Sequence, residues 1–261
     1  MPHLLNAADA GGPAVQPLHR TRSPSEASGI LTIDLAAILA NWRQLCARVA
    51  PADCSAVVKA DAYGTGLARV GTALDAAGCR TFFVAVPSEG AVLRRACPNA
   101  AIYILNGLAR GLGGLYLADQ LRPVLGSLDE IREWQALCRD TGAGHEAAIH
   151  IDTGMHRLGV SMPEFASLLS ASGRHRLGFP LSLILSHFVT SDDAGHPLNR
   201  RQMRDFRAAR ALAPEIPASL ANSSGIFLGA EAHHDQVRPG YALFGGNPTP
   251  GGTNPMRAVV T

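Results

Sequence analysis

The sequence predicts an α/β fold, a (β/α)8 barrel in which eight parallel strands alternate with helices. The chain has 261 residues, of which 47% are hydrophobic, and one such barrel typically uses about 250 residues. Short runs of branched and aromatic residues alternate repeatedly with amphipathic stretches, which is the pattern of parallel strands joined by helices. Because alternation does not prove closure, an open doubly wound sheet is the alternative.

Apolar periodicity places the elements in chain order. Residues 32–49 are expected to form a helix, because their apolar side chains recur at steps of three and four and share one face. Asp34 is the expected cap of that helix. Strands are expected at residues 55–59, 81–86, 101–105, 123–125, 147–151, 181–186, 218–221 and 236–238. Residues 128–139 and 199–212 are expected to be two of the helices between them.

Charge and composition exclude several classes of function. The net charge of +2 and the isoelectric point near 8.4 are too small for a nucleic-acid-binding surface. No apolar run approaches the roughly 18 residues of a membrane helix, so a soluble, cytoplasmic protein is expected. The five cysteines are scattered without a CxxC pair, which predicts buried thiols and neither a disulfide framework nor a metal site.

Polar and reactive residues follow several of the expected strands. In barrels of this kind the active site collects at the carboxyl ends of the strands and in the loops after them. The residues singled out there are Lys59, Tyr63, Arg157, His187, Asn222, Ser223, Arg238, Gly240 and Tyr241. They predict a site for a small molecule at that end of the barrel.

Lys59 is the only lysine of the chain, and its amine is a candidate for Schiff-base chemistry. Desolvation at the end of an apolar strand is expected to lower the pKa of the Lys59 ammonium and free the amine. The alternative is a solvated strand-end lysine without a chemical role.

The other strand-end residues suit the recognition of anions. Arg157 follows a glycine-containing turn, where a guanidinium can grip a phenolic oxygen or a carboxylate, or form a surface ion pair. His187 can pack on an aromatic cofactor or be a satisfied core histidine. Asn222, Ser223 and the backbone near Gly240 are groups that bind phosphate, but such residues are also common in turns.

Five segments taken together resemble the motifs of alanine racemases. The segments are AVVKADAYGTG, IDTGMHRLGV, SHF followed by TSDD, LANSSG and VRPGYALFGGNP. They come in the family's order with similar spacing, and five ordered motifs are far more specific than one. The chain is therefore identified as resembling the TIM-type barrel domain of this family, without its C-terminal β domain.

This resemblance also divides the chain. Residues 1–29 are expected to be a disordered N-terminal arm, since they mix Pro, Gly, Ser and Ala with a few charges. Residues 30–250 are expected to be the cofactor-binding barrel. Residues 251–261 are expected to begin the linker to the absent C-terminal domain.

The resemblance implies a pyridoxal 5'-phosphate enzyme, an isomerase that interconverts L- and D-alanine and supplies D-alanine for the cell wall. Lys59 would hold the cofactor as an internal aldimine, and Tyr63 would hydrogen-bond its phosphate. Ser223, together with the backbone of Gly240 and Tyr241, would complete the phosphate cradle. Asn222 would lie beside that cradle.

Three further residues are implied to contact the cofactor ring or the substrate. Arg157 is expected near the phenolic oxygen and the substrate carboxylate, and His187 against the pyridine ring or its neighbouring arginine. Arg238 is expected to donate to the pyridine nitrogen. Because an arginine does not give up its proton, the ring nitrogen would stay unprotonated, which favours proton removal and return at Cα over decarboxylation or transamination.

The chain departs from the family pattern at two points. Racemisation needs acid/base groups on opposite faces of the substrate, and Lys59 resembles the group serving D-alanine. In the family the other group is a tyrosine from the C-terminal domain of the neighbouring subunit of a homodimer, and none of the chain's four tyrosines matches it. His150 stands where many members have a carbamylated lysine that orients the arginine, so the positioning of Arg157 is an open question.

Two other functions therefore remain open on sequence grounds. One is a barrel that binds or carries pyridoxal phosphate without catalysis, or an inactive fragment of a racemase. The other is racemisation of a different amino acid such as serine, because the carboxylate and amine contacts do not depend on the side chain. In each case the expected partner is a small molecule, with no nucleic acid, membrane or metal.

Overall fold

A computed structural model describes residues 29–172 and 177–261 of the chain. Residues 33–261 form one compact unit. The expected disordered arm at residues 1–29 lies, apart from Gly29, outside the described residues.

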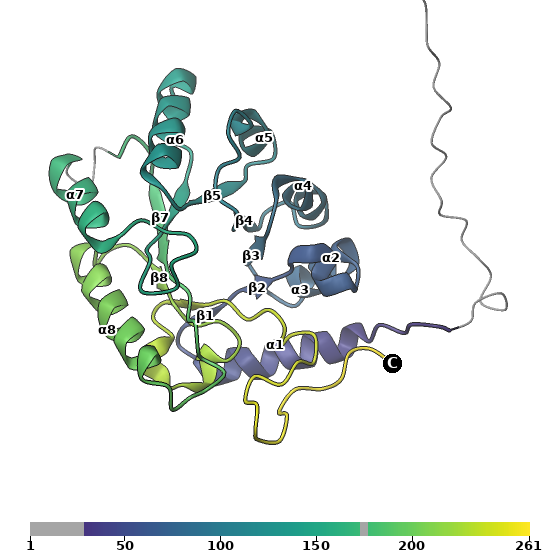
Figure 1. The fold of residues 1–261 in the computed structure, drawn as a ribbon. Helices are drawn as coiled ribbons and strands as arrows, with labels where there is room; N and C mark the ends of the chain where they lie inside the picture. The colour runs from purple at the N-terminus through teal and green to yellow at the C-terminus, as the bar shows by residue number, and fades with distance from the viewer. Residues whose placement is uncertain (1–28, 173–176) are drawn as a thin grey trace, which may run out of the picture. The chain divides into compact units, whose positions relative to one another are not determined.

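Parallel strands in chain order form the centre of this unit (Figure 1). Among the described residues, β2 to β8 form one sheet in the order of the sequence, and β1 pairs with β9. Every one of these pairs is parallel. The strands are β1 Asp53–Cys54, β2 Ala56–Val57, β3 Thr81–Val84, β4 Ala101–Ile104, β5 Arg122–Leu125, β6 Ala147–His150, β7 Leu181–Leu185, β8 Ala218–Ser219 and β9 Gln236–Val237.

Backbone hydrogen bonds close the strands into a barrel. β1 is separated from β2 only by Ser55, whose amide donates to the carbonyl of Val237 at 3.1 Å. On the other side of β9, the Asp235 amide donates to Ala218 at 3.1 Å and the Arg238 amide donates to Ala221 at 2.9 Å. Since β9 is bonded to both β8 and β1, the expected barrel is confirmed over the open sheet.

The helices surround the strands, as Figure 1 shows. They are α1 Leu35–Val49, α2 Lys59–Gly64, α3 Leu67–Ala76, α4 Pro87–Ala96, α5 Gly113–Ala118, α6 Leu128–Thr141, α7 Met162–Ser172 and α8 Pro197–Leu212, with short 3-10 turns at Gly225–Phe227 and Ala230–Ala232. The first helix begins later than expected, because Ile33 bridges to Val260. Asp34 caps this helix as expected, accepting from the Ala37 amide at 2.9 Å.

Alternating strand side chains divide the core into two parts. One buried cluster consists of Val57, Phe83, Tyr103, Val124, Ala148, Leu183 and Leu185. Strand residues at the intervening positions, such as Phe82 and Ile102, belong to the larger cluster that includes the helices. Because successive strand side chains point to opposite faces, the smaller cluster fills the barrel interior and forms the floor beneath the carboxyl ends of the strands.

The last residues of the chain pack against α1. The buried Asn41 side chain donates to the carbonyls of Leu243 and Arg257 at 3.1 and 3.0 Å, and it accepts from the Arg257 amide at 2.8 Å. Residues 251–261, expected to begin a linker, therefore lie within the same compact unit as the barrel.

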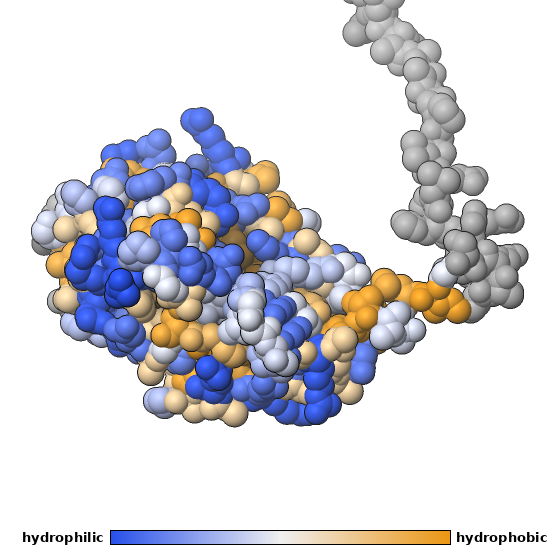
Figure 2. Space-filling model, turned by 60° about the horizontal axis from the view of Figure 1, so that its bottom comes forward, coloured by the Kyte–Doolittle hydropathy of each residue, from blue (hydrophilic) through white to orange (hydrophobic). Residues whose placement is uncertain are grey.

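The surface and the thiols add two observations. The face drawn in Figure 2 mixes hydrophilic residues with smaller apolar areas, and none of the described helices is long and apolar enough to cross a membrane.

Cys79, Cys97 and Cys138 are buried, but Cys46 and Cys54 are only half-buried. The expectation that all five thiols are buried was wrong for these two.

Candidate active site

A cavity of about 360 Å³ lies at the carboxyl ends of the strands. It is lined by Val57, Lys59, Tyr63, Leu105, Asn106, His150, Arg157, Leu158, Leu185, His187, Asn222, Ser223, Arg238, Gly240 and Tyr241. All nine residues singled out from the sequence are in this set. The structure therefore brings together side chains that are up to 182 positions apart in the chain, from Lys59 to Tyr241.

Lys59 begins α2, a turn with an unusual backbone. Ala60 to Tyr63 have φ angles from 52° to 56°, so four consecutive non-glycine residues are left-handed. Each costs roughly 1–2 kcal/mol, and neighbouring carboxylates hold the turn. Asp61 accepts from the Leu67 amide at 2.7 Å, and Glu89 accepts from the Asp61 amide at 3.3 Å.

The Lys59 side chain is exposed at the edge of the cavity. The desolvation expected from its place after an apolar strand is therefore not observed. The left-handed turn instead determines where the amine lies, because the chain reverses at once after Val58 and Lys59 remains accessible from solvent.

Tyr63 of α2 lies against Gly240, which follows β9. A Cβ atom on Gly240 would collide with the Tyr63 hydroxyl and would also contact Val57. The Tyr63 ring stacks on Phe244 with ring centroids 4.8 Å apart. Burial, with a smaller contribution from Tyr241, raises the pKa of the Tyr63 phenol. Tyr63 is therefore a hydrogen-bond donor at neutral pH, and glycine at position 240 leaves room for its hydroxyl.

Ser223 lies where the turn after β8 meets the turn after β9. Its hydroxyl oxygen accepts from the amides of Gly240 at 3.0 Å and Ala242 at 3.3 Å. Among the described residues, no acceptor is bonded to the amides of Ser223 and Tyr241. Ser223 is only 2% exposed, and buried amides without a partner are rare and costly. Two unpaired N–H groups beside a hydroxyl are suited to an anion.

Arg238 is held below the cavity by Ser219 of β8 and by Ser186, which follows β7. It is 4% exposed, and its terminal nitrogens donate to the carbonyl and hydroxyl of Ser219 and to the carbonyl of Ser186. Burial lowers the pKa of the Arg238 guanidinium to about 10. It therefore remains a cation and a donor at neutral pH.

Two histidines of the cavity are uncharged at neutral pH. Burial, reinforced by Arg238 and Arg157, lowers the pKa of His187 to about 3. Burial and Arg238 lower the pKa of His150 to about 4. These rings therefore offer neutral imidazole faces and nitrogen atoms to a ligand, while the charge comes from the neighbouring cations.

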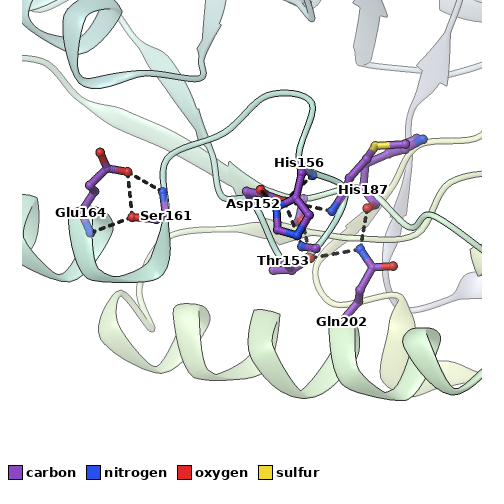
Figure 3. A network of polar contacts seen from close by, with 10 residues as sticks. Asp152, Thr153, His156, Ser161, Glu164, His187 and Gln202 are labelled. Carbon is purple, nitrogen blue, oxygen red and sulfur yellow. Dashed lines mark hydrogen bonds and ion pairs between the residues drawn. The ribbon is translucent and has the colours of Figure 1, made fainter.

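Arg157 is on the loop after β6, which also carries Asp152 and His156, both labelled in Figure 3. Asp152 Oδ1 accepts from the amides of residues 154, 155 and 156 at 2.9 to 3.1 Å, and Oδ2 contacts His156 Nδ1 at 2.8 Å. Partial burial raises the pKa of Asp152, but the hydrogen bonds from Gly154 and His156 outweigh it and lower the pKa overall. A carboxylate thus fixes the loop that presents Arg157.

Gln202 of α8 joins this loop to the one carrying His187. Its Nε2 donates to the His187 carbonyl at 2.9 Å and to the Thr153 hydroxyl at 3.2 Å, as Figure 3 shows. Its Oε1 accepts from the Val189 amide at 3.0 Å. The loops after β6 and β7 are therefore held at a set separation by one buried amide.

The charges of the cavity lining are one-sided. Lys59, Arg157 and Arg238 are cations, and no carboxylate is found among the described residues that line the cavity. Three cations without an acid in the same cavity favour an anionic ligand.

Two of the four tyrosines lie away from this cavity. Tyr103 is 3% exposed and contacts Ser182 and Arg122 through its hydroxyl. The Tyr116 hydroxyl donates to the Gly107 carbonyl at 2.7 Å. Neither residue lines the cavity.

Several residues of the lining were not singled out from the sequence. Val57 and Leu185 also belong to the interior cluster, and Leu105 and Asn106 follow directly after β4. The position of Asn106 after a strand could have identified it. Leu158 follows Arg157 and had no distinguishing signal.

Comparison with known proteins identifies the family. Residues 33–248 match the family described as alanine racemase, N-terminal domain. The chain belongs to the alanine racemase family. The resemblance seen in the sequence motifs is thereby confirmed.

Relatives of known sequence and structure agree with this assignment. The alanine racemase of Methylobacterium sp. (strain 4-46) is 54% identical over 230 residues, which are 88% of this chain and 63% of that protein. The alanine racemase of Bartonella henselae, solved with covalently bound pyridoxal phosphate, is 41% identical with a TM-score of 0.84, covering 88% of this chain and 67% of that one. That of Streptomyces coelicolor A3(2) is 31% identical with a TM-score of 0.82, covering 88% and 64%. The chain spans slightly less than two thirds of the curated relatives it matches.

Proposed function

We propose that this barrel binds pyridoxal phosphate through Lys59 and performs the lysine side of the proton transfer in an alanine racemase. The observation that carries the proposal is the cavity itself. It places the chain's only lysine beside two further cations and two amides that have no described acceptor, and no carboxylate is among the described lining residues. The family relationship supports the choice of cofactor and substrate.

The end of the cavity near Ser223 fits a phosphate group. The amides of Ser223 and Tyr241 have no described acceptor, and the Ser223 hydroxyl lies beside them. Tyr63 reaches the same place, where a side chain on residue 240 would displace it. Phosphate is bound well by convergent N–H and O–H donors. We therefore assign the phosphate to this end.

The other side chains are suited to a planar ring and a carboxylate. Arg238 is fixed below the cavity, and its guanidinium, which can only donate hydrogen bonds, suits the acceptor nitrogen of a pyridine ring. The neutral His187 offers a flat uncharged face, and Arg157 supplies a charge for the phenolic oxygen or the substrate carboxylate. Pyridoxal phosphate, when bound, supplies the electron sink that makes the Cα proton of an amino acid removable.

Lys59 has two roles in this proposal. Its amine would hold the cofactor covalently, and once substrate has entered, Nζ would take or return the proton at Cα of alanine on one face. Because Lys59 is exposed at the cavity edge, it can reach a substrate entering from solvent. Arg157 and Arg238 would orient the substrate and the ring, and Arg238 keeps its proton at neutral pH because its pKa is about 10.

A cofactor-binding barrel without racemase activity of its own is the second candidate. It is favoured by one observation: Tyr103 and Tyr116 lie outside the cavity with their hydroxyls hydrogen-bonded, and the Tyr241 hydroxyl is occupied by Ser224 and Asn247. Tyr63, the fourth tyrosine, lines the cavity but is the one we assign to the phosphate, so no described tyrosine is left for the second face of the substrate. Loss of one acid/base group typically costs roughly 10²- to 10⁴-fold in rate.

One experiment separates these functions. The purified chain is incubated with pyridoxal phosphate, its absorbance spectrum is recorded, and borohydride reduction with peptide mapping locates the attached cofactor. A chiral assay then follows L- and D-alanine in both directions. We expect the label on Lys59. Alanine racemisation with that label supports the racemase, whereas the label without racemisation supports the cofactor-binding barrel.

The matched variants are Lys59→Arg and Lys59→Ala. Lys59→Arg keeps the positive charge without an amine that forms a Schiff base, so it should still bind the phosphate but lose covalent attachment and proton transfer. If reduction labels the wild-type chain elsewhere, or if Lys59→Arg retains the covalent label, the proposal is wrong.

A further inference from the structure

We infer that Gln202 is a positioning residue that holds Arg157 at a fixed place relative to His187. The consequence of this for alanine binding rests on the proposed function. Gln202 lies on α8, is 0% exposed and is not part of the cavity lining. It can therefore influence a ligand only through the residues that it contacts.

The amide of Gln202 contacts the loops that follow two neighbouring strands. On the loop after β7, its Oε1 accepts from the Val189 amide at 3.0 Å, and its Nε2 donates to the His187 carbonyl at 2.9 Å. On the loop after β6, the same Nε2 donates to the Thr153 hydroxyl at 3.2 Å, as Figure 3 shows. Both ends of the amide are thus engaged, and one side chain bridges the two loops.

A second contact joins the same two loops beneath this amide. The hydroxyl oxygens of Thr153 and Ser186 are 2.7 Å apart, and both residues are buried. The Ser186 carbonyl in turn accepts from Arg238. Because a fully bonded buried network specifies one arrangement of its members, Thr153 is fixed relative to both His187 and Arg238.

The loop after β6 transmits the position of Thr153 to Arg157. Asp152 accepts from the amides of residues 154, 155 and 156, so the backbone between Thr153 and Arg157 is held as a single turn. Arg157 is exposed, and its place therefore depends on the backbone that carries it. Gln202 thus sets Arg157 against His187 through two short links.

Under the proposed function, Arg157 binds the carboxylate of alanine, while His187 packs on the ring of the cofactor. Loss of Gln202 should weaken binding of alanine more than binding of pyridoxal phosphate. The reason is that the contacts of Arg238 with Ser219 do not involve Gln202, and neither do the phosphate-binding groups at the other end of the cavity.

Two variants at position 202 test these hydrogen bonds. Gln202→Met keeps the approximate size of the side chain and removes every bond that the amide makes. Gln202→Glu keeps the shape, but an ionised carboxylate cannot donate to the His187 carbonyl. Burial raises the pKa of a carboxyl group, so acidic pH should restore the proton and with it the donor. The partners of position 202 are an amide, a carbonyl and a hydroxyl, and the His187 ring, with a pKa of about 3, stays neutral.

The first measurement needs no cofactor. Trypsin cleavage after Arg157 is followed in the full apo chain and divided by cleavage after Arg132 of α6 in the same digest, so that global unfolding cancels. Relative to wild type at the same pH, we expect Gln202→Met to be cleaved at least about tenfold faster at both about pH 6 and about pH 8.5, and Gln202→Glu only at about pH 8.5. Unchanged cleavage in Gln202→Met, or no effect of pH on Gln202→Glu, would overturn the inference. The second variant carries the test if the first does not fold.

Asn199→Leu is the matched control. Asn199 is also a buried amide of α8, 2% exposed, and its Nδ2 donates to the carbonyls of Thr190 and Asp193. These acceptors lie farther along the loop after β7, so the control should leave relative cleavage after Arg157 unchanged. Equal acceleration in the control would show that general loosening of α8 is the cause, and the inference would then be wrong.

The second measurement titrates alanine into the cofactor-loaded chain and follows the absorbance of the cofactor. In Gln202→Met the dissociation constant should rise about tenfold for alanine and less than about threefold for pyridoxal phosphate. A larger loss of cofactor affinity than of alanine affinity would show that Gln202 does not act through Arg157. If the wild-type chain takes up no cofactor, the proposed function fails, and cleavage after Arg157 still decides the role of Gln202.

Discussion

Arg238 donates through one terminal nitrogen to both the carbonyl and the hydroxyl oxygen of Ser219, at 2.8 and 2.6 Å. The other terminal nitrogen donates to the Ser186 carbonyl at 2.5 Å. Ser219 and Arg238 are 0% and 4% exposed. A buried guanidinium tied to two neighbouring strands can take only one orientation, so the Arg238 edge that faces the cavity is set by the barrel backbone before a ligand binds.

Replacement of Ser219 by alanine should loosen this arginine. The variant removes one charge-assisted hydrogen bond to Arg238 and the bond from the Ser219 hydroxyl to the Gln236 carbonyl. Losing a buried hydrogen-bond partner typically costs roughly 1–3 kcal/mol of stability. We also expect the dissociation constant for pyridoxal phosphate to rise about tenfold. Urea unfolding and a spectroscopic titration with the cofactor measure the two effects.

Ser55→Ala is the matched control for Ser219→Ala. Ser55 is also buried and also donates its hydroxyl proton to a β9 carbonyl, that of Val237 at 2.6 Å, but it does not contact Arg238. Both variants should lose stability, and only Ser219→Ala should lose cofactor affinity. Equal affinities for the two variants would show that the orientation of Arg238 does not control binding.

Gly240→Ala should weaken binding of the phosphate. The added Cβ would meet the Tyr63 hydroxyl, and moving that ring also disturbs its stacking on Phe244. Overpacking typically costs roughly 1–3 kcal/mol, so we expect about a tenfold or larger rise in the dissociation constant for pyridoxal phosphate. Equilibrium dialysis of cofactor against the apo chain measures it.

Gly114→Ala provides the comparison for Gly240→Ala. Gly114 lies in α5 and an added Cβ there meets nothing within 4 Å. Because alanine favours a helix over glycine, this variant should keep the cofactor affinity and unfold at an equal or higher temperature. An unchanged affinity of Gly240→Ala would contradict the placement of the phosphate beside Tyr63.

The sequence predicted most of the strands because each is a short apolar run ending at a polar residue. It placed Lys59, Ser223 and Arg238 at strand ends, and the barrel then brought them together because parallel strands present their carboxyl ends at the same edge. The strand predicted at residues 55–59 extends too far. In the structure β2 ends at Val57, and the left-handed turn begins at Lys59.

That turn could not be predicted from local preferences. Ala60 and Ala62 have no preference for positive φ, so only the surrounding contacts from Asp61 and Glu89 explain it. The exposure of Lys59 follows from the turn and was missed with it. The apolar lining residues, such as Leu185, were missed because a cavity wall and a packed core have the same residue types.

The stability of the apo chain should fall at acidic pH partly through His150. Burial and Arg238 lower the pKa of His150 to about 4 in the folded chain, against about 6.5 when unfolded. Between these values the unfolded chain binds a proton that the folded chain does not, so the contribution is present above pH 6.5 and is lost as pH falls toward 4. At about pH 5 the loss from this group is about 2 kcal/mol.

His150→Asn tests this assignment with chemical unfolding at about pH 8 and about pH 5. Asparagine does not titrate, so the fall in unfolding free energy between the two values should be smaller than in the wild-type chain. Each variant serves as its own control, since any packing defect is present at both pH values. An identical fall in both chains would show that His150 is not held neutral by the fold.

Asp152→Ala should release the loop that presents Arg157. The carboxylate accepts from three consecutive backbone amides and contacts His156, so its loss leaves the loop without its main constraint. Trypsin cleaves after arginine, and we expect cleavage after Arg157 to become at least about tenfold faster, which corresponds to roughly 1.4 kcal/mol of local stability. Asp129→Ala removes an exposed carboxylate paired with Arg132 on α6 and should leave that rate unchanged. If the chain racemises alanine, the Asp152 variant should raise KM for alanine more than it lowers kcat, because we propose that Arg157 binds the substrate carboxylate. Unaltered cleavage at Arg157, with the protein folded by circular dichroism, would show that another contact holds the loop.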